Sequence, residues 1–340
     1  MALHRRVERR RLAILCSLLL LVAVFLVLDV ATGPALLPVG DVLAALLRRD
    51  GEDPTLLAIV WELRLPMGLM ALAVGVALGT SGASMQTLLD NPLASPYTLG
   101  LAAAAGVGAS LCIQNGGWGL NPAFIVPACA FVMACFASAI IYGVGTIRGM
   151  GTDTMVLAGI ALLFLFHSLQ SLLQFRASPE VGQQIVFWLF GSLAKATWTS
   201  VTITTLACLG AVPLLLRQSW KLTALRLGEQ RARALGVNVS RLRFVTIALI
   251  SLMTATAISF VGTIGFIGLV APHLSRLLVG EDQRFLLPMS GLVGALLLSA
   301  ASVLSKIIMP GVLVPVGIVT ALVGVPFFFH LILSRRRLDA

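Results

Sequence analysis

The sequence predicts an all-α polytopic membrane protein with about ten transmembrane helices. Of its 340 residues, 58% are hydrophobic and only 11% are charged, whereas a soluble domain of this length carries about 25% charged residues. Apolar runs of roughly 20 residues, long enough to cross a ~30 Å hydrocarbon layer, recur along the whole chain. These runs are expected to be helices, because backbone polar groups in lipid must be satisfied within their own segment.

Ten spans follow from the positions of these runs, and the eighth is the shortest. They cover residues 12–30, 65–88, 97–113, 123–145, 154–174, 197–216, 245–263, 268–278, 286–304 and 315–333. Basic residues flank the spans and form no independent domain, so residues 1–340 are expected to be a single transmembrane domain. The first span also has the basic and apolar regions of a secretory signal, but its long apolar run and poor cleavage site favour a retained helix.

The distribution of charge orients the spans. With the N-terminus inside, 18 of the 24 lysines and arginines fall on the cytoplasmic side, which satisfies the positive-inside rule and places both termini in the cytoplasm. The remaining six are Arg48, Arg49, Arg64, Arg176, Lys195 and Lys306. The net charge of +10 therefore reflects membrane orientation, and no nucleic-acid partner is expected.

The sequence lacks the motifs that would let the chain drive transport or catalysis by itself. It contains no Gly-x-x-x-x-Gly-Lys-Ser/Thr phosphate cradle, no His-Glu-x-x-His pair and no Gly-x-Ser-x-Gly elbow. All 14 acidic residues lie in loops or near span ends, whereas an ion-coupled carrier usually places a carboxylate deep in the membrane. An ion-coupled secondary transporter is thereby disfavoured, an intramembrane enzyme has no credible catalytic set, and the energy for transport is expected to come from other subunits.

A basic, water-soluble loop over residues 217–243 interrupts the apolar pattern between the sixth and seventh spans. It carries seven lysines or arginines and one acid, Glu229. Gly228 and Gly236 bracket a predicted short helix over residues 229–235, on which Ala232 and Leu235 are expected to share a face. A helix this short needs a packing surface, and the pattern leaves two open: a partner protein, or anionic lipid headgroups.

Four stretches of the sequence together resemble one family of permeases. They are RLPMGLMALAVGVALGTSGASMQTLLDNPLASPYTLG (64–100), LRLGEQRARALGV (225–237), GTIGFIGLVAPHLSRLLVGEDQRFLLP (262–288) and LVPVGIVTALVGVPFFF (313–329). This is the family that imports iron-siderophores, haem and vitamin B12 in type II ABC importers. The resemblance runs from about residue 56 to residue 333, with the four motifs in the family's order.

The resemblance implies a fold, a set of partners and a coupling site. The fold is the inverted-repeat type II ABC importer permease fold, in the bacterial inner membrane. The implied partners are a second permease subunit (identical or related), two cytoplasmic ATPase subunits that hold ATP and Mg²⁺, and a periplasmic substrate-binding protein, with no cofactor in this chain. Residues that match the family's ATPase-coupling motif are Leu227, Gly228, Glu229, Ala232, Leu235 and Gly236.

Two prolines are candidates for turns at a gate. Asn91-Pro92 follows the second span, and proline disfavours helix at the preceding residue, so a sharp break is expected. Pro272 is expected to make a comparable break, because Pro92 follows Arg64 by 28 residues and Pro272 follows Arg243 by 29. The two breaks indicate an inverted repeat over spans two to five and seven to ten. Each is either a plain turn or a moving part of the cytoplasmic gate.

A polar stripe runs along the fifth span. His167, Gln170, Ser171 and Gln174 recur at helical spacing, and such stripes face the bundle interior or a water-filled path. They are interpreted either as interhelical hydrogen-bonding groups or as the wall of the translocation path. The second interpretation is favoured because the family lines its path partly with this helix.

Two basic residues are candidates for docking the binding protein. Arg64 matches a family arginine that meets acidic residues of the binding protein, and Lys306 stands where another is expected. A further arginine expected after the Leu-Pro step is Met67 here.

The function expected from these observations is import of a ferric siderophore or similar iron chelate by an ATP-driven importer, with this chain as its membrane subunit. Haem and vitamin B12 are the alternatives within the family. The sequence leaves open which chelate is carried and whether the permease pair is a homodimer or a heterodimer.

Overall fold

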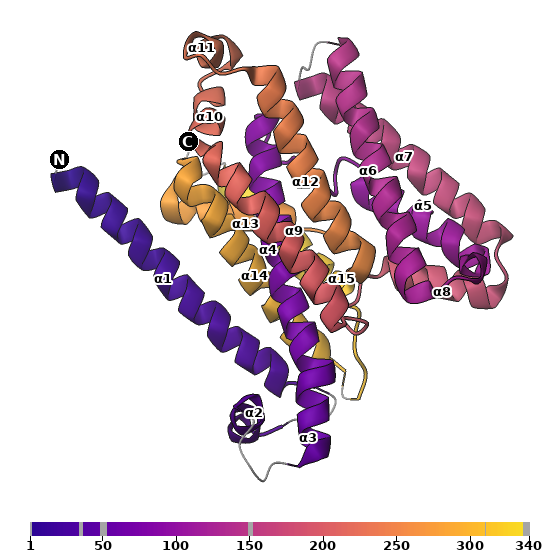
Figure 1. The fold of residues 1–340 in the computed structure, drawn as a ribbon. Coiled ribbons are helices and arrows are strands. Elements are labelled where there is room, and N and C mark those ends of the chain that lie inside the picture. The colour runs from indigo at the N-terminus through magenta and orange to yellow at the C-terminus, as the bar shows by residue number, and fades with distance from the viewer. Residues whose placement is uncertain (1, 34–36, 48–52, 149–151, 310, 336–340) are drawn as a thin grey trace.

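A computed structural model describes residues 2–33, 37–47, 53–148, 152–309 and 311–335, and every regular element in these residues is a helix (Figure 1). Four of the residues used to orient the spans, Arg48, Arg49, Arg336 and Arg337, lie outside this part of the chain. The elements in chain order are α1 (Ala2–Ala31), α2 (Val39–Leu46), α3 (Pro54–Ala58), η1 (Ile59–Arg64), α4 (Leu65–Leu88), α5 (Leu101–Gln114), η2 (Gly116–Gly119), α6 (Pro122–Arg148), α7 (Thr152–Arg176), α8 (Pro179–Leu189), α9 (Trp198–Arg217), α10 (Ser219–Leu225), α11 (Glu229–Ala234), α12 (Val239–Val261), α13 (Ile267–Val279), α14 (Gln283–Ile307) and α15 (Val316–Arg335).

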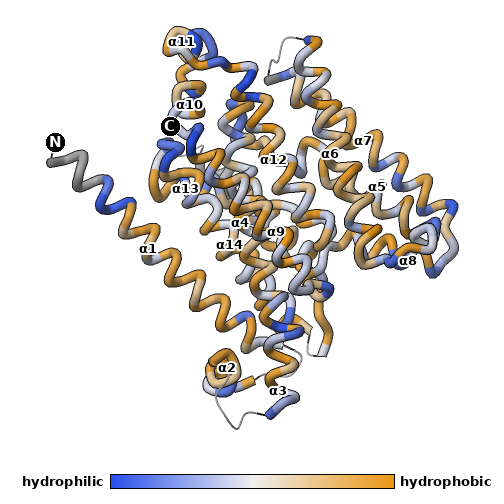
Figure 2. The backbone as a smooth tube through the Cα atoms, in the orientation of Figure 1, coloured by the Kyte–Doolittle hydropathy of each residue, from blue (hydrophilic) through white to orange (hydrophobic). Residues whose placement is uncertain are grey.

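Ten apolar helices correspond in order to the ten predicted spans. Within the described residues, seven are long and apolar enough to cross a membrane, and three more are shorter: Leu101–Gln114, Ile267–Val279 and Val316–Phe329. Hydrophobic residues fill the middle of the bundle, while hydrophilic residues gather around α11 and at other helix ends (Figure 2). The predicted all-α polytopic fold is confirmed.

The bundle contains two series of four helices with matching lengths. Helices α4 to α7 have 24, 14, 27 and 25 residues, and α12 to α15 have 23, 13, 25 and 20. In each series a long helix is followed by a short one after a break. Helices α4 and α12 run in opposite directions (Figure 1). This arrangement agrees with the predicted inverted repeat.

The prediction of a break at Pro272 is wrong. Pro272 lies inside α13, and the chain turns earlier, at Gly262 (φ 76°) and Phe266 (φ 66°). Proline has no N–H, so Pro272 cannot donate to the carbonyl of Gly268, four residues earlier. The loss of this hydrogen bond normally kinks or breaks a helix. Here that oxygen lies against Gly82 of α4, where an added Cβ would overlap it. A neighbouring helix thus accommodates the freed carbonyl inside the bundle.

Helix α4 is the centre of the bundle. It packs against α14, α13, α12 and α9, and most of its side chains are buried. Its crossing with α14 is close, because a Cβ on Gly79 would overlap the carbonyl oxygen of Ser290 and one on Gly294 would overlap that of Gly75. Small residues permit this approach of two backbones in lipid.

Candidate functional site

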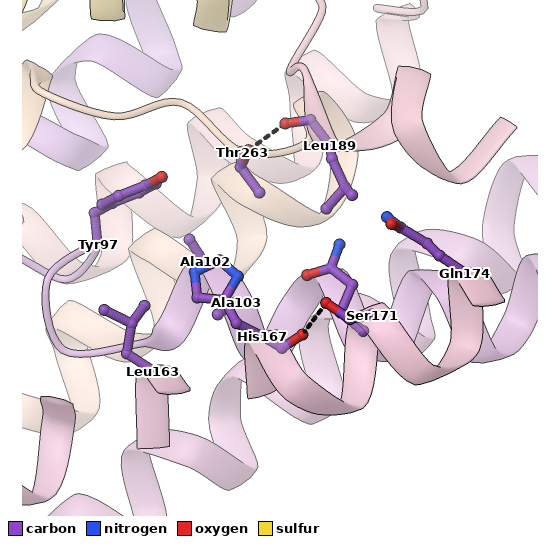
Figure 3. A pocket seen from close by; sticks show the side chains of 10 residues that line it. Tyr97, Ala102, Ala103, Leu163, His167, Ser171, Gln174, Leu189 and Thr263 are labelled. Atoms are coloured by element: carbon purple, nitrogen blue, oxygen red, sulfur yellow. Dashed lines mark hydrogen bonds between the residues drawn. The ribbon is translucent and has the colours of Figure 1, made fainter. Parts of the chain in front are cut away.

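The polar stripe of α7 forms one wall of a cavity of about 270 Å³ (Figure 3). All four predicted residues border it: His167, Gln170, Ser171 and Gln174. Leu163 of α7 also borders it, and the rest of the lining comes from four other parts of the chain: Tyr97, Ala102 with Ala103, Leu189 and Thr263. The structure therefore brings the predicted stripe together around a space that a molecule could enter.

The amide of Gln170 is the most buried of the polar side chains that line this cavity. It is 5% exposed and packs on Gly106 of α5, where an added Cβ would lie 3.2 Å from its Oε1. Its polar atoms make no hydrogen bond to the residues that the structure describes. The Ser171 hydroxyl, in contrast, already donates to the backbone carbonyl of His167 at 3.0 Å (Figure 3).

The basic loop leaves one end of the bundle as two short helices, α10 and α11 (Figure 1). The predicted helix is present with its end one residue earlier, at Ala234. Both bracketing glycines have left-handed backbones, with φ of 101° at Gly228 and 82° at Gly236, a region that glycine enters without strain. At the end of α11 the N–H of Val237 donates to the Ala232 carbonyl at 3.0 Å, a Schellman closure that requires this backbone at Gly236.

Glu229 attaches α11 to the membrane domain. Its carboxylate lies 2.5 Å from Arg233 on the same helix and 3.1 Å from the guanidinium of Arg243 on α12. The Arg243 side chain is only 9% exposed, so this ion pair holds α11 against a residue that is itself fixed.

The expectation that Ala232 and Leu235 share a face is wrong. Ala232 is fully buried, whereas Leu235 is 58% exposed. Leu235 follows the last helical residue, and its backbone is no longer helical. The helical spacing therefore does not apply to it. Ala232 seats α11 on its own protein. The large apolar side chains that stay exposed over residues 219–235 are Leu235, Leu227 at 55% and Trp220 at 51%.

Asn91 and Pro92 form the sharp turn that was predicted after α4. The chain leaves α4 through Asp90, whose φ is 42°, and the N–H of Asn91 closes the helix on the Gln86 carbonyl at 3.1 Å. The Asn91 side chain then accepts from the N–H of Leu93 at 2.9 Å, an Asx turn. The structure accounts for the turn; a role in gating stays a prediction.

Arg64 and Lys306 are not surface residues, which corrects the prediction that they dock a partner. They are 7% and 5% exposed. Arg64 donates to the carbonyls of Val30 and Ala31 at 3.1 and 2.9 Å, and Lys306 pairs with Asp29 at 2.7 Å. Both cations donate hydrogen bonds to carbonyls at the end of α1. The last carbonyls of a helix have no partner within it and attract positive charge.

Comparison with known proteins decides the family. Residues 19–334 match the sequence model of the FecCD transport family. The chain belongs to this family. The Fe(3+)-citrate import system permease protein YfmE of Bacillus subtilis (strain 168) is 33% identical to it over 328 residues, covering 96% of each chain. The vitamin B12 import system permease protein BtuC of Salmonella schwarzengrund (strain CVM19633) is 34% identical over 336 residues, covering 98% of each.

A solved relative supports the FecCD assignment in three dimensions. An inward-facing metal-chelate type ABC transporter superimposes on this chain with a TM-score of 0.83 at 31% identity, covering 95% of this chain and 99% of that one. The FecCD chain is thus related over nearly its whole length to permease subunits of ABC importers.

Part of the cavity in this FecCD family member was not predicted. Tyr97 and Thr263 come from the breaks before α5 and α13, and Leu189 ends α8, a helix that was not expected. The start of α8 could have been predicted from the sequence. Ser178 caps the helix and Pro179 is its first residue, which is the usual order of serine and proline at a helix N-terminus. No comparable local signal marks Tyr97 or Thr263.

Proposed function

We propose that this chain is the membrane-spanning subunit of an ATP-driven importer that moves a ferric siderophore or similar iron chelate into the cytoplasm, with haem and vitamin B12 as the alternative cargoes. The observation that carries the proposal is the segment α10–α11, which projects from an otherwise apolar bundle. It presents Leu227 and Leu235 to the outside and is fixed to the bundle through Glu229 and Arg243. Such a segment is suited to receive force from a partner.

The proposed assembly contains two permease subunits, two cytoplasmic ATPase subunits at the α11 end and a periplasmic binding protein at the opposite end. ATP and Mg²⁺ would bind to the ATPase subunits, and both termini of this chain would lie in the cytoplasm of a bacterial inner membrane. With Arg64 and Lys306 buried, the exposed cations of the described chain at the opposite end are Arg176 and Lys195. These two are the better candidates for meeting acidic groups of the binding protein.

The arrangement of the cavity disfavours an ion-coupled carrier. No aspartate or glutamate is among the residues that line it. The buried carboxylate of Asp29 lies at the end of α1 and is neutralised by Lys306, so it is not placed to bind a coupling ion in the path.

The test is transport in proteoliposomes that contain this chain, its ATPase partners and its binding protein. Uptake of a ferric siderophore is expected to require ATP and to stop when the ATPase subunits cannot hydrolyse it. Parallel assays with haem and vitamin B12 identify the cargo. Uptake that survives loss of ATP hydrolysis and collapses with a protonophore would support the carrier instead.

A further inference from the structure

A buried glutamine joins three helix ends at the α11 end of the molecule. Gln283, the first residue of α14, is 0% exposed. Its side-chain Nε2 donates to the hydroxyl of Thr87 on α4 at 2.9 Å, and its backbone N–H donates to the hydroxyl of Thr223 on α10 at 3.4 Å. Helices α4, α10 and α14 are therefore connected through one residue.

Both threonine hydroxyls are oriented for this connection. The Thr87 hydroxyl donates its proton to the Ala83 carbonyl, and the Thr223 hydroxyl donates to the Ser219 carbonyl, each at 2.9 Å. A hydroxyl has a single proton, so each threonine can only accept from Gln283. The direction of both hydrogen bonds is thereby determined by the helices that carry the threonines.

The turn before Gln283 is also tied to the segment α10–α11 by charge. Glu281 forms an ion pair with Arg226, the residue that follows α10, and lies 3.3 Å from Arg276 of α13. Displacement of α10 would therefore pull on this turn at two neighbouring points, Glu281 and Gln283.

The same turn reaches α1 through Asp282. A hydrogen bond from the Arg284 side chain, aided by the nearby charge of Arg11, lowers the pKa of Asp282 and keeps it ionised. The Asp282 carboxylate lies 3.6 Å from the guanidinium of Arg11 on α1. The turn is thus held on several sides, which favours its movement as one unit.

A residue that merely filled space would not need an amide at this position. The Oε1 atom of Gln283 is buried without a hydrogen-bond partner among the described residues, and burying such an oxygen is unfavourable. An apolar side chain of similar volume would avoid that cost. The specific contribution of the amide is its bond to Thr87, which lies in the last turn of α4, just before the Asn91-Pro92 turn.

We propose that Gln283 is a positioning residue that carries displacement of α10 and α11 to the end of α4 and the Asn91-Pro92 turn. The proposal rests on the proposed function, because it assumes that ATPase subunits move this segment. The route is separate from the Glu229–Arg243 ion pair, which joins α11 to α12.

The experiment measures substrate transported per ATP hydrolysed by the complete reconstituted transporter, together with its thermal unfolding midpoint. Three variants each remove one part of the connection: Gln283→Met, Thr87→Val and Thr223→Val. The matched control is Thr80→Val. Thr80 is a buried threonine on α4, as Thr87 is, but its hydroxyl has no hydrogen-bond partner among the described residues. The conservative threonine variants test the proposal even where Gln283→Met folds poorly.

The connection predicts that Gln283→Met, Thr87→Val and Thr223→Val each lower the transport ratio about three- to tenfold, the range that one lost hydrogen bond allows. The double variant of Gln283→Met and Thr87→Val should fall no further than either single variant, because both remove the same bond, and Thr80→Val should keep the wild-type ratio. Unchanged ratios in the single variants, multiplied losses in the double variant, or an equal loss in Thr80→Val would overturn the role of Gln283. A wild-type assembly that moves no chelate in response to ATP would overturn the proposed function, and this role with it.

Discussion

The Lys306 ammonium lies 2.7 Å from both the carboxylate and the backbone carbonyl of Asp29, and both side chains are buried. This contact joins the end of α1 to α14. Ser302 of α14 adds a hydrogen bond to the same carboxylate at 2.7 Å. One face of α1 is exposed, with Leu20 at 69%, while Ile14, Leu15 and Leu18 pack on the apolar cluster of α13 and α14. The ion pair adds a polar attachment at the end of the helix.

Lys306→Met is expected to destabilise the protein by about 3–5 kcal/mol, because it leaves the Asp29 carboxylate buried without its cation. Adding Asp29→Asn to the same protein removes that charge and should recover much of the loss. Thermal unfolding of the purified protein in detergent measures both effects. Lys195→Met, which removes an exposed lysine, is the control and should leave the midpoint unchanged; equal shifts for Lys195 and Lys306 would contradict the importance of burial.

Gly79→Ala is expected to destabilise the bundle by about 1–3 kcal/mol, because the new methyl group would overlap the Ser290 carbonyl and force α4 away from α14. The matched variant is Gly143→Ala in α6, where nothing lies within 4 Å of the added group. That variant should be neutral or more stable by about 0.5–1 kcal/mol. The comparison uses the same thermal measurement, and a midpoint for Gly79→Ala at or above that of Gly143→Ala would show that the crossing is looser than described.

The helices could be predicted because their lengths are set locally, whereas the pairing of charges could not. Apolar runs of sufficient length become spans wherever they pack. Asp29 and Lys306, however, are separated by 277 positions, and a lysine at a span end has the same local pattern whether it faces water or a buried carboxylate. The surface role given to Lys306 was wrong because no local feature of the sequence reveals its partner.

The errors at Pro272 and Ala232 have the same origin. A proline predicts a break because it removes a hydrogen bond, but α13 continues because Gly82 of another helix accommodates the freed carbonyl. Ala232 was placed with Leu235 by helical spacing, which ends where the chain closes at Gly236. The common face of the four α7 residues could be predicted because they share one helix, whereas the contributions of Tyr97 and Thr263 to the cavity depend on tertiary packing and could not. A role of the stripe in the translocation path stays a prediction.

Gln170→Leu is expected to lower chelate uptake about fivefold, the effect of losing about 1 kcal/mol of hydrogen bonding to a molecule in the cavity. Gln170→Asn keeps an amide and should retain more activity. Initial uptake rates in proteoliposomes provide the measurement. The control is Leu172→Ala on the same helix, since Leu172 is 54% exposed and does not line the cavity; its uptake should stay within about twofold. If Gln170→Leu transported as well as the wild type, the interhelical interpretation of the stripe would be preferred.

Leu235→Ala is expected to weaken binding of the ATPase subunits about fivefold or more, because an exposed apolar side chain on a docking surface contributes about 1 kcal/mol or more when a partner covers it. The matched control is Ile147→Ala at the end of α6, where Ile147 is 82% exposed but lies outside the segment α10–α11. Dissociation constants of detergent-solubilised permease for purified ATPase subunits measure the effect, and the thermal midpoint of the permease alone should not change for either variant. Equal weakening by both variants would indicate a contact that is not centred on α11. If neither Leu235→Ala nor Leu227→Ala changed the dissociation constant, the ATPase subunits would bind elsewhere.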